Sequence, residues 1–554
     1  MRLATSLLSV ALVPTIGFLP ALAQAAIVPD AGQVQQSLEQ APLQLPERQR
    51  LELNLPDAPI DPAAESGPRL LVKGFAFDGN HALTSPELLE LLADLPEREL
   101  TIGQLQAAAN RITRVYRERG YPLARAYLPA QEIDGGMVTI AVLEGRYGQV
   151  QIDDQAGLSS SALAPLAALQ AGDAVQARPL ERSLLLLQDT PGVEVKSTLR
   201  PGTSTGTSDL LVNIERAPLL SGSIDADNYG NRFTGQYRLG GTLNLNSPLG
   251  LGDRLTLRAM SSDEEQNYGR IAYQLPVGPW STQLGVAYSD MDYQLAKDFE
   301  DLDAHGNARI ASVFALQPLV RSRDFSLYAQ VQFDDKRLQD DIDLFDQKNA
   351  KRSRVVILTL NGNSRDTLLG GGVNSFALAW SQGSLNLDDT TAQRIDDLTA
   401  GTAGRFHKLN PSLVRLQRLT ERLSLYTQLQ GQWADGNLDG SEKLYLGGAY
   451  GVRAYPQGEA SGDQGWLANL ELRYALTDTW QLSTFIDHGE VRLNKDTWAS
   501  GENHRSLSGA GLGARWAAHG WQVSAVTAWK LGNTDPQSDV DRSPRVWAQV
   551  VRFF

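Results

Sequence analysis

The chain has 554 residues, of which 50 are basic and 64 acidic, so its formal net charge is −14, and it contains no cysteine. That length exceeds one ordinary domain, and we expect two or three structural units. The acidic balance argues against a nucleic-acid-binding protein, which needs a basic surface. The lack of cysteine excludes disulfides and thiolate chemistry. Beyond the extreme N-terminus, no apolar run is long enough to cross a membrane as a helix.

The N-terminus has the features of a signal peptide. Met1-Arg2 is a short basic region, residues 3–19 are broadly apolar, and Ala21-Leu22-Ala23 offers small residues for cleavage. We therefore predict a signal peptide over residues 1–23 and export to the cell envelope.

Residues 24–42 contain one predicted helix, from Asp30 to Ala41. Asp30 can cap this helix, and Val34, Leu38 and Ala41 form only a thin apolar stripe. Such a polar helix suits a water-filled lumen, where it would act as a plug; a frayed N-terminal tail is the alternative. The proline-rich residues 43–68 predict an extended, semi-rigid linker.

Two small α+β units are predicted next, over residues 69–145 and 146–217, and they share the order β-α-α-β-β. In the first unit, strands are expected at 70–77, 123–128 and 138–143, with helices beginning at Ser85 and spanning 102–119. In the second unit, strands are expected at 150–152, 193–199 and 210–214, with helices at 158–169 and 178–188. Each unit offers a strand edge that can accept an extended peptide.

From residue 218 to 554 polar and apolar side chains alternate, as in Asn469–Tyr474, which is the period of a strand with two different faces. We count about sixteen strands, an even number, as bacterial single-chain barrels have. Short turns are expected near 247–252, 277–278, 320–323, 363–366, 420–421, 477–479 and 519–520. Longer polar loops are expected at 298–307, 337–351, 386–401, 436–462, 494–504 and 533–543. Short turns at one rim and long loops at the other are typical of an antiparallel outer-membrane β-barrel.

All ten tryptophans lie at or after Trp280. Aromatic girdles mark the two membrane interfaces of a barrel, so we expect several tryptophans near strand ends to lie there. These are Trp280, Trp480, Trp498, Trp521 and Trp547. Packing in an ordinary β core is the alternative.

Six short motifs lie in order on the predicted elements. They are Arg119-Gly120-Tyr121-Pro122, Val142-Leu143-Glu144-Gly145, Asp227-Asn228-x-Gly230 with Thr234-Gly235-x-x-Arg238, Pro248-Leu249-Gly250-Leu251-Gly252-Asp253, Gly451-Val452-Arg453-Ala454-Tyr455 and Phe485-Ile486-Asp487-His488-Gly489. Together with the tandem units and the barrel, they resemble the POTRA-plus-barrel superfamily. Within it, the nearest match is the transporters of two-partner secretion (TpsB, the haemolysin secretion/activation ShlB/FhaC/HecB type).

The resemblance implies a sixteen-stranded barrel whose sixth external loop folds into the lumen. It also implies a functional contact between loop and wall, in which Arg453 pairs with Asp487. The residues that match the family's two motifs are Val452, Arg453, Tyr455, Phe485, Asp487 and Gly489. Strand parity independently places Asp487 opposite Ile486, on the lumen face, and an arginine–carboxylate pair can be bidentate. Ala454 replaces the glycine usual in this motif, and a positive φ there would strain alanine.

The function implied by the resemblance is protein export across the outer membrane. The POTRA-like units would bind one large secreted partner protein in the periplasm, such as an adhesin, haemolysin or toxin. The partner would then cross unfolded through the lumen of a monomeric barrel held in outer-membrane lipid. An assembly factor for other barrels, from the same superfamily, is one alternative; a passive porin is another.

Enzyme and cofactor motifs are weak in this sequence. Gly202-Thr203-Ser204-Thr205-Gly206 fits the pattern of a hydrolase nucleophile, but it lies in a predicted hairpin and not at a strand-to-helix elbow. The six histidines show no metal-ligand spacing. We therefore expect no enzymatic activity, no catalytic residue, no metal, no cofactor and no nucleic-acid partner.

Overall fold

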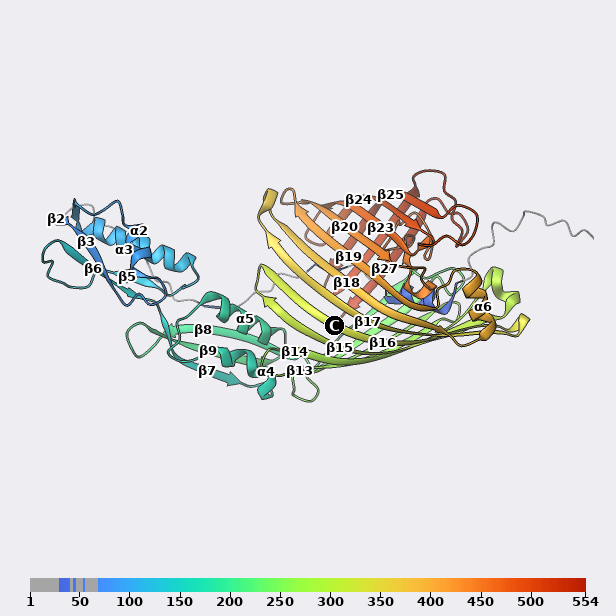
Figure 1. Ribbon diagram of the computed structural model, residues 1–554, viewed down its shortest axis with the longest axis horizontal. Helices are drawn as coiled ribbons and strands as arrows, with labels where there is room; N and C mark the ends of the chain where they lie inside the picture. Colours follow the sequence, from blue (N-terminus) through green and yellow to red (C-terminus); the bar gives the residue numbers. More distant parts are fainter. Residues whose placement is uncertain (1–28, 40–42, 46–52, 55–67) are drawn as a thin grey trace, which may run out of the picture.

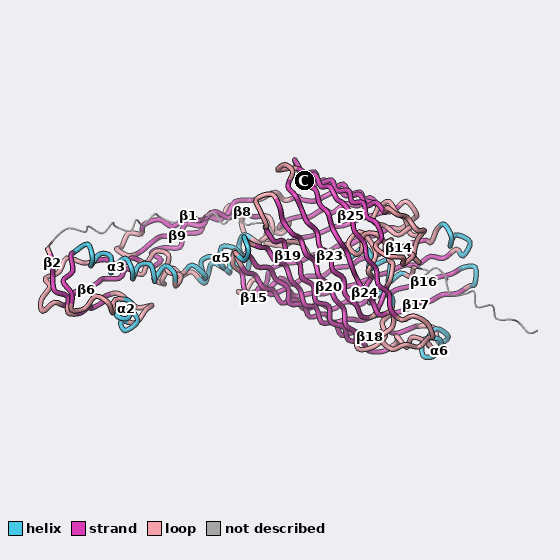
Figure 2. Tube along the Cα trace, turned by 90° about the horizontal axis from the view of Figure 1, so that it is seen from above, coloured by secondary structure: helices cyan, strands magenta, loops and turns pink. Residues whose placement is uncertain are grey.

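The structure, a computed structural model, describes residues 29–39, 43–45, 53–54 and 68–554. Two small α/β units follow one another away from one end of a large β-barrel (Figure 1, Figure 2). We call the barrel rim beside these units the near rim and the opposite one the far rim. The predicted signal peptide and most of the predicted linker lie outside the described residues.

The first α/β unit is built on α3 (Ile102–Glu118), whose buried face includes Leu105, Ile112 and Tyr116. Its other elements are β2 (Arg69–Val72), β3 (Gly74–Asp78), α2 (Ser85–Leu91), β4 (Arg98–Thr101), β5 (Arg125–Tyr127) and β6 (Met137–Leu143). The single strand expected at 70–77 is divided, because the main chain of Lys73 and Gly74 donates to Gly136 instead of continuing one ladder. The first half, β2, pairs with β4, which the sequence did not predict, and the second half joins the sheet β3-β6-β5.

The second unit packs α5 (Ala177–Gln188) on a four-stranded sheet in the order β1-β8-β9-β7. The other elements are β1 (Leu53–Asn54), β7 (Arg146–Asp154), α4 (Ser160–Leu163), the 3-10 helix η1 (Ala164–Ala168), β8 (Val193–Pro201) and β9 (Thr207–Arg216). The helix expected at 158–169 is therefore two short turns, with Pro165 near the start of the second. Strand β1 belongs to the predicted linker and pairs in parallel with β8.

Sixteen antiparallel strands close the barrel, which confirms the predicted fold class, and the ring is completed where β27 pairs with β10. The strands are β10 (Leu220–Asp227), β11 (Arg238–Asn246), β12 (Arg254–Ser262), β13 (Asn267–Val277), β14 (Thr282–Gln294), β15 (Ala304–Arg321), β16 (Phe325–Ile342), β17 (Gln347–Asp366), β18 (Gly372–Leu387), β19 (Gly404–Arg418), β20 (Leu423–Ala434), β23 (Gln464–Ala475), β24 (Trp480–Arg492), β25 (His504–Ala518), β26 (Trp521–Lys530) and β27 (Arg545–Phe553). Among the residues described, no helix is long and apolar enough to cross a bilayer.

Most connections at the far rim are longer than the turns at the near rim, although residues 263–266 join β12 to β13 there in a short turn. Two predicted positions differ from the structure. The long loop expected at 337–351 is wrong, because β16 and β17 continue through it and only residues 343–346 join them. Both faces of these strands are polar there, so the alternation that identifies a strand disappears. The turn expected at 363–366 lies instead at 367–371. Shorter elements in the connections are η2 (Lys297–Leu302), η3 (Asp343–Phe345), η4 (Leu368–Gly370), α6 (Thr390–Leu398), η5 (Gly440–Glu442), β21 (Leu444–Tyr445) and β22 (Ser461–Gly462).

The outer face of the wall is apolar and its ends carry tryptophan. Trp280, Trp480 and Trp521 are exposed at the near rim, and Trp498 is exposed in a far-rim loop. The prediction for Trp547 is wrong: its side chain is only 3% exposed and points into the lumen, where the indole N–H donates to the carbonyl oxygen of Arg453. Alternation decides this orientation, because Trp547 lies on the strand face opposite the exposed Val546.

Arginines join the second α/β unit to the near rim. Arg321 at the end of β15 makes two hydrogen bonds to the carboxylate of Asp189, at 2.6 and 2.9 Å. Arg323 in the next turn pairs with Glu181 of α5 at 3.1 Å. These contacts hold α5 against the near rim of the barrel.

Candidate functional site in the barrel lumen

The lumen contains two segments that do not belong to the wall. The first is α1 (Ala31–Glu39), blue in Figure 1, which the sequence predicted as a polar helix reaching Ala41; residues 40–42 lie outside the described part. Asp30 caps it by accepting a hydrogen bond from the Gln33 N–H at 2.8 Å. Ala31 and Val34 pack with residues on the inner wall, including Met291.

The second segment is the far-rim loop 435–463, the sixth in chain order, which we call the inward loop. A short ladder between β21 and β22 gives it two paired arms, with Leu444 opposite Gly462. Beyond this ladder the chain makes a compact tip in which the Val452 N–H donates to the Leu446 carbonyl at 2.7 Å. This tip holds Arg453.

Arg453 contacts the wall through a bidentate ion pair. Its Nε lies 2.9 Å from Asp487 Oδ2, and its Nη2 lies 2.8 Å from Asp487 Oδ1. The main-chain N–H of Arg453 donates to the same carboxylate at 3.1 Å. Asp487 is fully buried, so this geometry compensates a charge that would otherwise be costly to desolvate. We call this contact, together with its neighbours below, the loop–wall lock.

Glu471 is a second carboxylate in contact with Arg453, and it balances the charge of a second arginine. Arg453 Nη1 lies 2.9 Å from Glu471 Oε2, and Arg473 Nε lies 3.0 Å from Glu471 Oε1, so two arginines meet two carboxylates. The Arg453 guanidinium carbon also lies 3.4 Å from the centre of the Phe485 ring, close enough for a cation–π contact. Burial disfavours the charge of Arg453, but the hydrogen bonds and proximity of Asp487 and Glu471 outweigh burial and raise its pKa.

Close packing holds the loop tip against the wall. Val452, Tyr455 and Phe485 belong to one buried apolar cluster, and the Tyr455 hydroxyl donates to the Thr534 carbonyl at 3.1 Å. At Gly489 an added Cβ would lie 2.8 Å from a methyl carbon of Leu446 in the inward loop. A larger residue there would require the Leu446 side chain to shift, so glycine favours the close approach of the loop. The structure thus brings all six predicted residues to one contact.

Ala454 is accommodated without the strain considered from the sequence. The φ angle of Ala454 is not positive, so the alanine adopts an ordinary backbone conformation. Its methyl group lies against Gly509 of β25, where an added Cβ would approach it to 2.6 Å. The small residue that this contact requires is therefore supplied by the wall.

Several residues of the lock did not stand out in the sequence, although strand parity places two of them in the lumen. Asn469 and Glu471 alternate with Leu470 and Leu472 on β23, and both are buried. The Asn469 amide donates to Asp487 Oδ1 at 2.8 Å and to the Gly451 carbonyl at 2.9 Å. Parity shows which residues face the lumen, but it does not show which of them the loop will contact.

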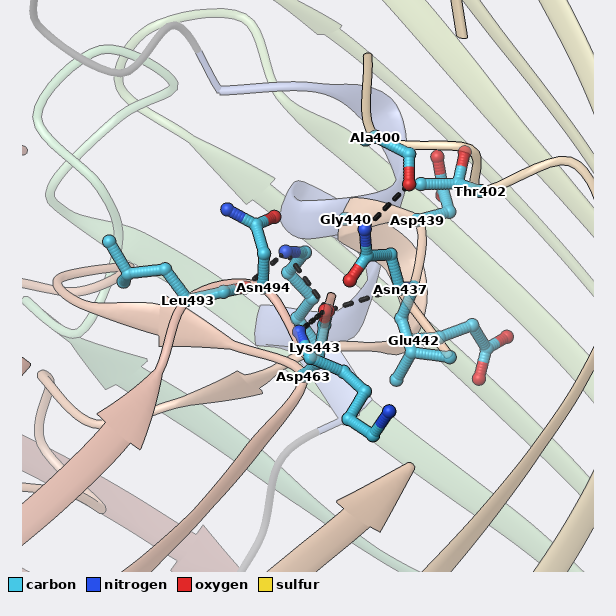
Figure 3. Close-up of polar contacts among 12 residues, drawn as sticks. Ala400, Thr402, Asn437, Asp439, Gly440, Glu442, Lys443, Asp463, Leu493 and Asn494 are labelled. Atoms are coloured by element: carbon cyan, nitrogen blue, oxygen red, sulfur yellow. Dashed lines mark hydrogen bonds and ion pairs between the residues drawn. The ribbon is translucent and has the colours of Figure 1, made fainter. Parts of the chain in front are cut away.

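The base of the inward loop is held by a separate polar cluster (Figure 3). Lys443 lies 3.0 Å from the buried carboxylate of Asp463 and donates to the Leu493 carbonyl at 2.7 Å. The Asn437 amide donates to the Ala400 carbonyl at 2.6 Å, which ties the loop to the neighbouring far-rim loop. The loop is thus fixed at both its tip and its base.

Glu442 anchors the loop to two wall lysines. Its carboxylate lies 2.8 Å from Lys336 Nζ and 2.7 Å from Lys408 Nζ. Burial alone would raise the pKa of Glu442, but the two ammonium groups prevail and lower it to about 2. Glu442 is therefore ionised at neutral pH.

Lys351 connects the inward loop with α1. Its ammonium group on β17 lies 2.8 Å from Asp439 of the loop and 3.3 Å from Asp30 at the start of α1. The N–H of Ala31 donates to Asp340 on β16 at 2.6 Å. Gly32 then allows helix and loop to touch, since an added Cβ would lie 2.5 Å from the Ser441 Cβ. One buried cation is thus shared by both lumen segments.

The charged groups described above form ion pairs with one another. Ser204, of the hydrolase-like motif, lies in the turn between β8 and β9, as the sequence predicted. Within the described residues, no three His, Cys, Asp or Glu side chains are grouped in a way that could hold a metal ion.

The fold and the lumen contacts define an outer-membrane β-barrel transporter with periplasmic POTRA domains. A model of the haemolysin secretion/activation protein ShlB/FhaC/HecB family matches residues 206–516, and a model of the ShlB-type POTRA domain matches residues 70–145. The chain therefore belongs to this family, and the predicted resemblance and the outer-membrane location are confirmed. The near rim is periplasmic and the far rim is external.

Named relatives span most of the chain. The heme/hemopexin transporter protein HuxB of Haemophilus influenzae is 27% identical over 541 residues, which is 95% of each chain. The hemolysin transporter protein ShlB of Serratia marcescens is 26% identical and covers 78% of this chain and 77% of its own. The solved structure of CdiB from Escherichia coli superposes with a TM-score of 0.73 at 23% identity, covering 95% of this chain and 96% of that one. The family consists of transporters that support secretion of partner proteins, not of enzymes.

Proposed function

We propose that this protein recognises one large secreted partner protein in the periplasm and passes it, unfolded, through its barrel to the cell surface. In this scheme residues 24–42 form a plug, 43–68 a linker, 69–145 and 146–217 the two POTRA domains, and 218–554 a monomeric barrel in outer-membrane lipid. The partner belongs to the adhesin, haemolysin or toxin class. The observation that carries the proposal is a lumen that contains two segments held to the wall and to each other by ion pairs.

The partner is captured by strand addition in the POTRA domains. The edge of β8 accepts an extended segment in this structure, since β1 pairs with it in parallel, with Asn54 opposite Thr198. Main-chain hydrogen bonds along such an edge give affinity with little dependence on sequence. An unfolded partner chain would take the place of β1 on this edge.

Passage requires that the lumen be cleared. Both α1 and the inward loop lie across the path, and their buried ion pairs must be exchanged for water or for the passing chain. With no nucleotide-binding motif in the sequence, direction would come from folding of the partner outside the cell.

A disulfide tests the capture step. The natural chain has no cysteine, so the double variant Asn54→Cys/Thr198→Cys carries the only pair, and the periplasm oxidises it. We expect the oxidised form to retain β1 and stop secretion, and a reductant to restore it. Each single cysteine variant is the control. Normal secretion with the disulfide fully formed would contradict capture at this edge.

Gene deletion separates the proposed transport from its alternatives. We expect the loss of one large exoprotein from the medium while other outer-membrane barrels assemble normally. Failure of barrel assembly with secretion intact would favour an assembly factor, and neither defect would favour a passive porin. Deletion of residues 30–41 should raise conductance in planar bilayers, and unchanged currents would contradict the plug.

A further inference from the structure

A cleft lies outside the lumen, where the second POTRA domain meets the periplasmic rim of the barrel. It has a volume of about 670 Å³ and is formed by η1 and α5 on one side and by the turns around Trp280 and Ser322 on the other. Neither the loop–wall lock nor the β8 edge contributes to it. The cleft is therefore separate from the two elements to which the transport proposal assigns a role.

The barrel side of the cleft is lined by exposed apolar side chains. A register shift between Pro318 and Val320 on β15 leaves two successive side chains exposed, with Leu319 at 47% and Val320 at 40%. Trp280 projects beside them and is 72% exposed, and Phe325 completes the wall. An exposed indole at a barrel rim is typical of the membrane interface.

The POTRA side of the cleft is cationic. Arg178 is exposed on the first turn of α5, and Arg182 lies one turn further along the same helix. The Arg182 guanidinium donates to the Pro318 carbonyl at 3.0 Å and to the Leu319 carbonyl at 3.2 Å, groups with no formal charge. The nearby carboxylates, Asp189 and Glu181, already bind Arg321 and Arg323. Two positive charges thus face the cleft in a chain whose net charge is −14.

We propose that this cleft binds an anionic phospholipid of the periplasmic leaflet of the outer membrane. The phosphate would lie between Arg178 and Arg182, whose planar guanidinium groups suit phosphate oxygens. The acyl chains would lie along Trp280, Leu319 and Val320 and continue into the bilayer. A bound lipid would join α5 to the wall and so hold the second POTRA domain against the membrane.

A partner polypeptide is the alternative occupant of the cleft. The position of the cleft on the barrel favours lipid. Leu319 lies on the same strand face as Val313, which is 58% exposed on the outer wall, so the cleft opens toward the bilayer and away from the lumen entrance. A chain entering the lumen would not pass this outer face.

Native mass spectrometry of the full-length protein in detergent tests the proposal. We expect one adduct with 1-palmitoyl-2-oleoyl-phosphatidylglycerol that is retained better than one with the corresponding phosphatidylcholine. Arg178→Gln should weaken this binding by about tenfold, the change that one charge-assisted hydrogen bond brings. Arg200→Gln, the same substitution on β8 of the same domain, should leave it unchanged.

The apolar contact has its own matched pair. Trp280→Ser should weaken phosphatidylglycerol binding, and Trp498→Ser, in an external loop, should not. Far-UV circular dichroism verifies that each variant is folded. Equal retention of both lipids, as a polypeptide cleft would give, overturns the proposal. The proposal is also overturned if Arg178→Gln binds phosphatidylglycerol as tightly as the parent does. It is overturned as well if inorganic phosphate stabilises the protein against heat as much as the lipid does.

Discussion

The loop–wall lock predicts that removing Asp487 will free the inward loop while leaving the barrel intact. In Asp487→Ala, the buried Arg453 keeps only Glu471, which it already shares with Arg473. Breaking one partner of a buried ion pair costs about 3–5 kcal/mol. Glu471 remains, so we take the lower end: about 3 kcal/mol, or roughly a 150-fold larger population of the open loop.

Cysteine labelling measures that population directly. Val452 is fully buried next to Arg453, and the natural chain offers no other thiol, so Val452→Cys reports when the loop tip leaves the wall. In intact cells, maleimide labelling from outside should be roughly 150-fold faster in the Asp487→Ala background, because its rate follows the open fraction. We expect secretion to fall while the barrel still inserts.

The control removes a carboxylate of a different ion pair. Asp335 on β16 pairs with Arg352 of the neighbouring strand at 2.7 Å, on the face opposite Lys336, which contacts the loop. Asp335→Ala should leave labelling unchanged. In Arg453→Met/Asp487→Leu, apolar groups replace both partners, so labelling should be slower than in Asp487→Ala. Equal labelling of Asp487→Ala and the parent would refute the reasoning.

Three further predictions concern the other contacts of the lumen. Lys351→Met leaves Asp30 and Asp439 without their shared cation, so planar-bilayer conductance should rise, whereas Lys348→Met on the exposed end of β17 should not change it. Glu442 has a pKa of about 2 against an ordinary 4.5, so its contribution to holding the loop is complete above pH 4.5 and is lost as pH falls through about 2. Conductance should therefore rise between pH 5 and pH 2 in the parent; Glu442→Gln should already conduct at neutral pH and respond less to acid, and an equal response in both would contradict this assignment. Gly509→Val removes the space for Ala454 and should speed labelling of Val452→Cys, whereas Gly269→Val, with no atom within 4 Å of the added Cβ, should have no effect.

The barrel could be predicted from the sequence because its wall has two chemically different faces. Leu470, Leu472 and Tyr474 face outward while Asn469 and Glu471 are buried, as the alternation indicates. The same alternation places the Asp487 side chain in the lumen independently of any contact with the loop. Where both faces are polar, as on β16 and β17 near Asp340 and Lys351, the prediction of a loop was wrong.

The contacts inside the lumen could not be predicted in the same way. Every strand places polar side chains there, and Glu471 does not differ in sequence from a lumen carboxylate that the loop never touches. Trp547 shows a different error. Its position near a strand end suggested a place in the aromatic girdle, but strand alternation points its side chain into the lumen. Arg453 and Asp487 were predicted only because the resemblance supplied the pairing between two distant segments.

Lys351 makes the plug helix and the inward loop energetically dependent on each other. If α1 leaves first, the ammonium group keeps Asp439 but loses Asp30, and if the loop leaves first the reverse holds. Each departure leaves one carboxylate to compensate the buried ammonium group, so the second departure would leave that charge unpaired and costs more than it would alone. Groups that share one partner typically show coupling energies of about 0.5–3 kcal/mol. A partner chain that displaces one segment would therefore find the other held more firmly by Lys351, and a cycle of Asp30→Asn and Asp439→Asn variants should give non-additive changes in conductance.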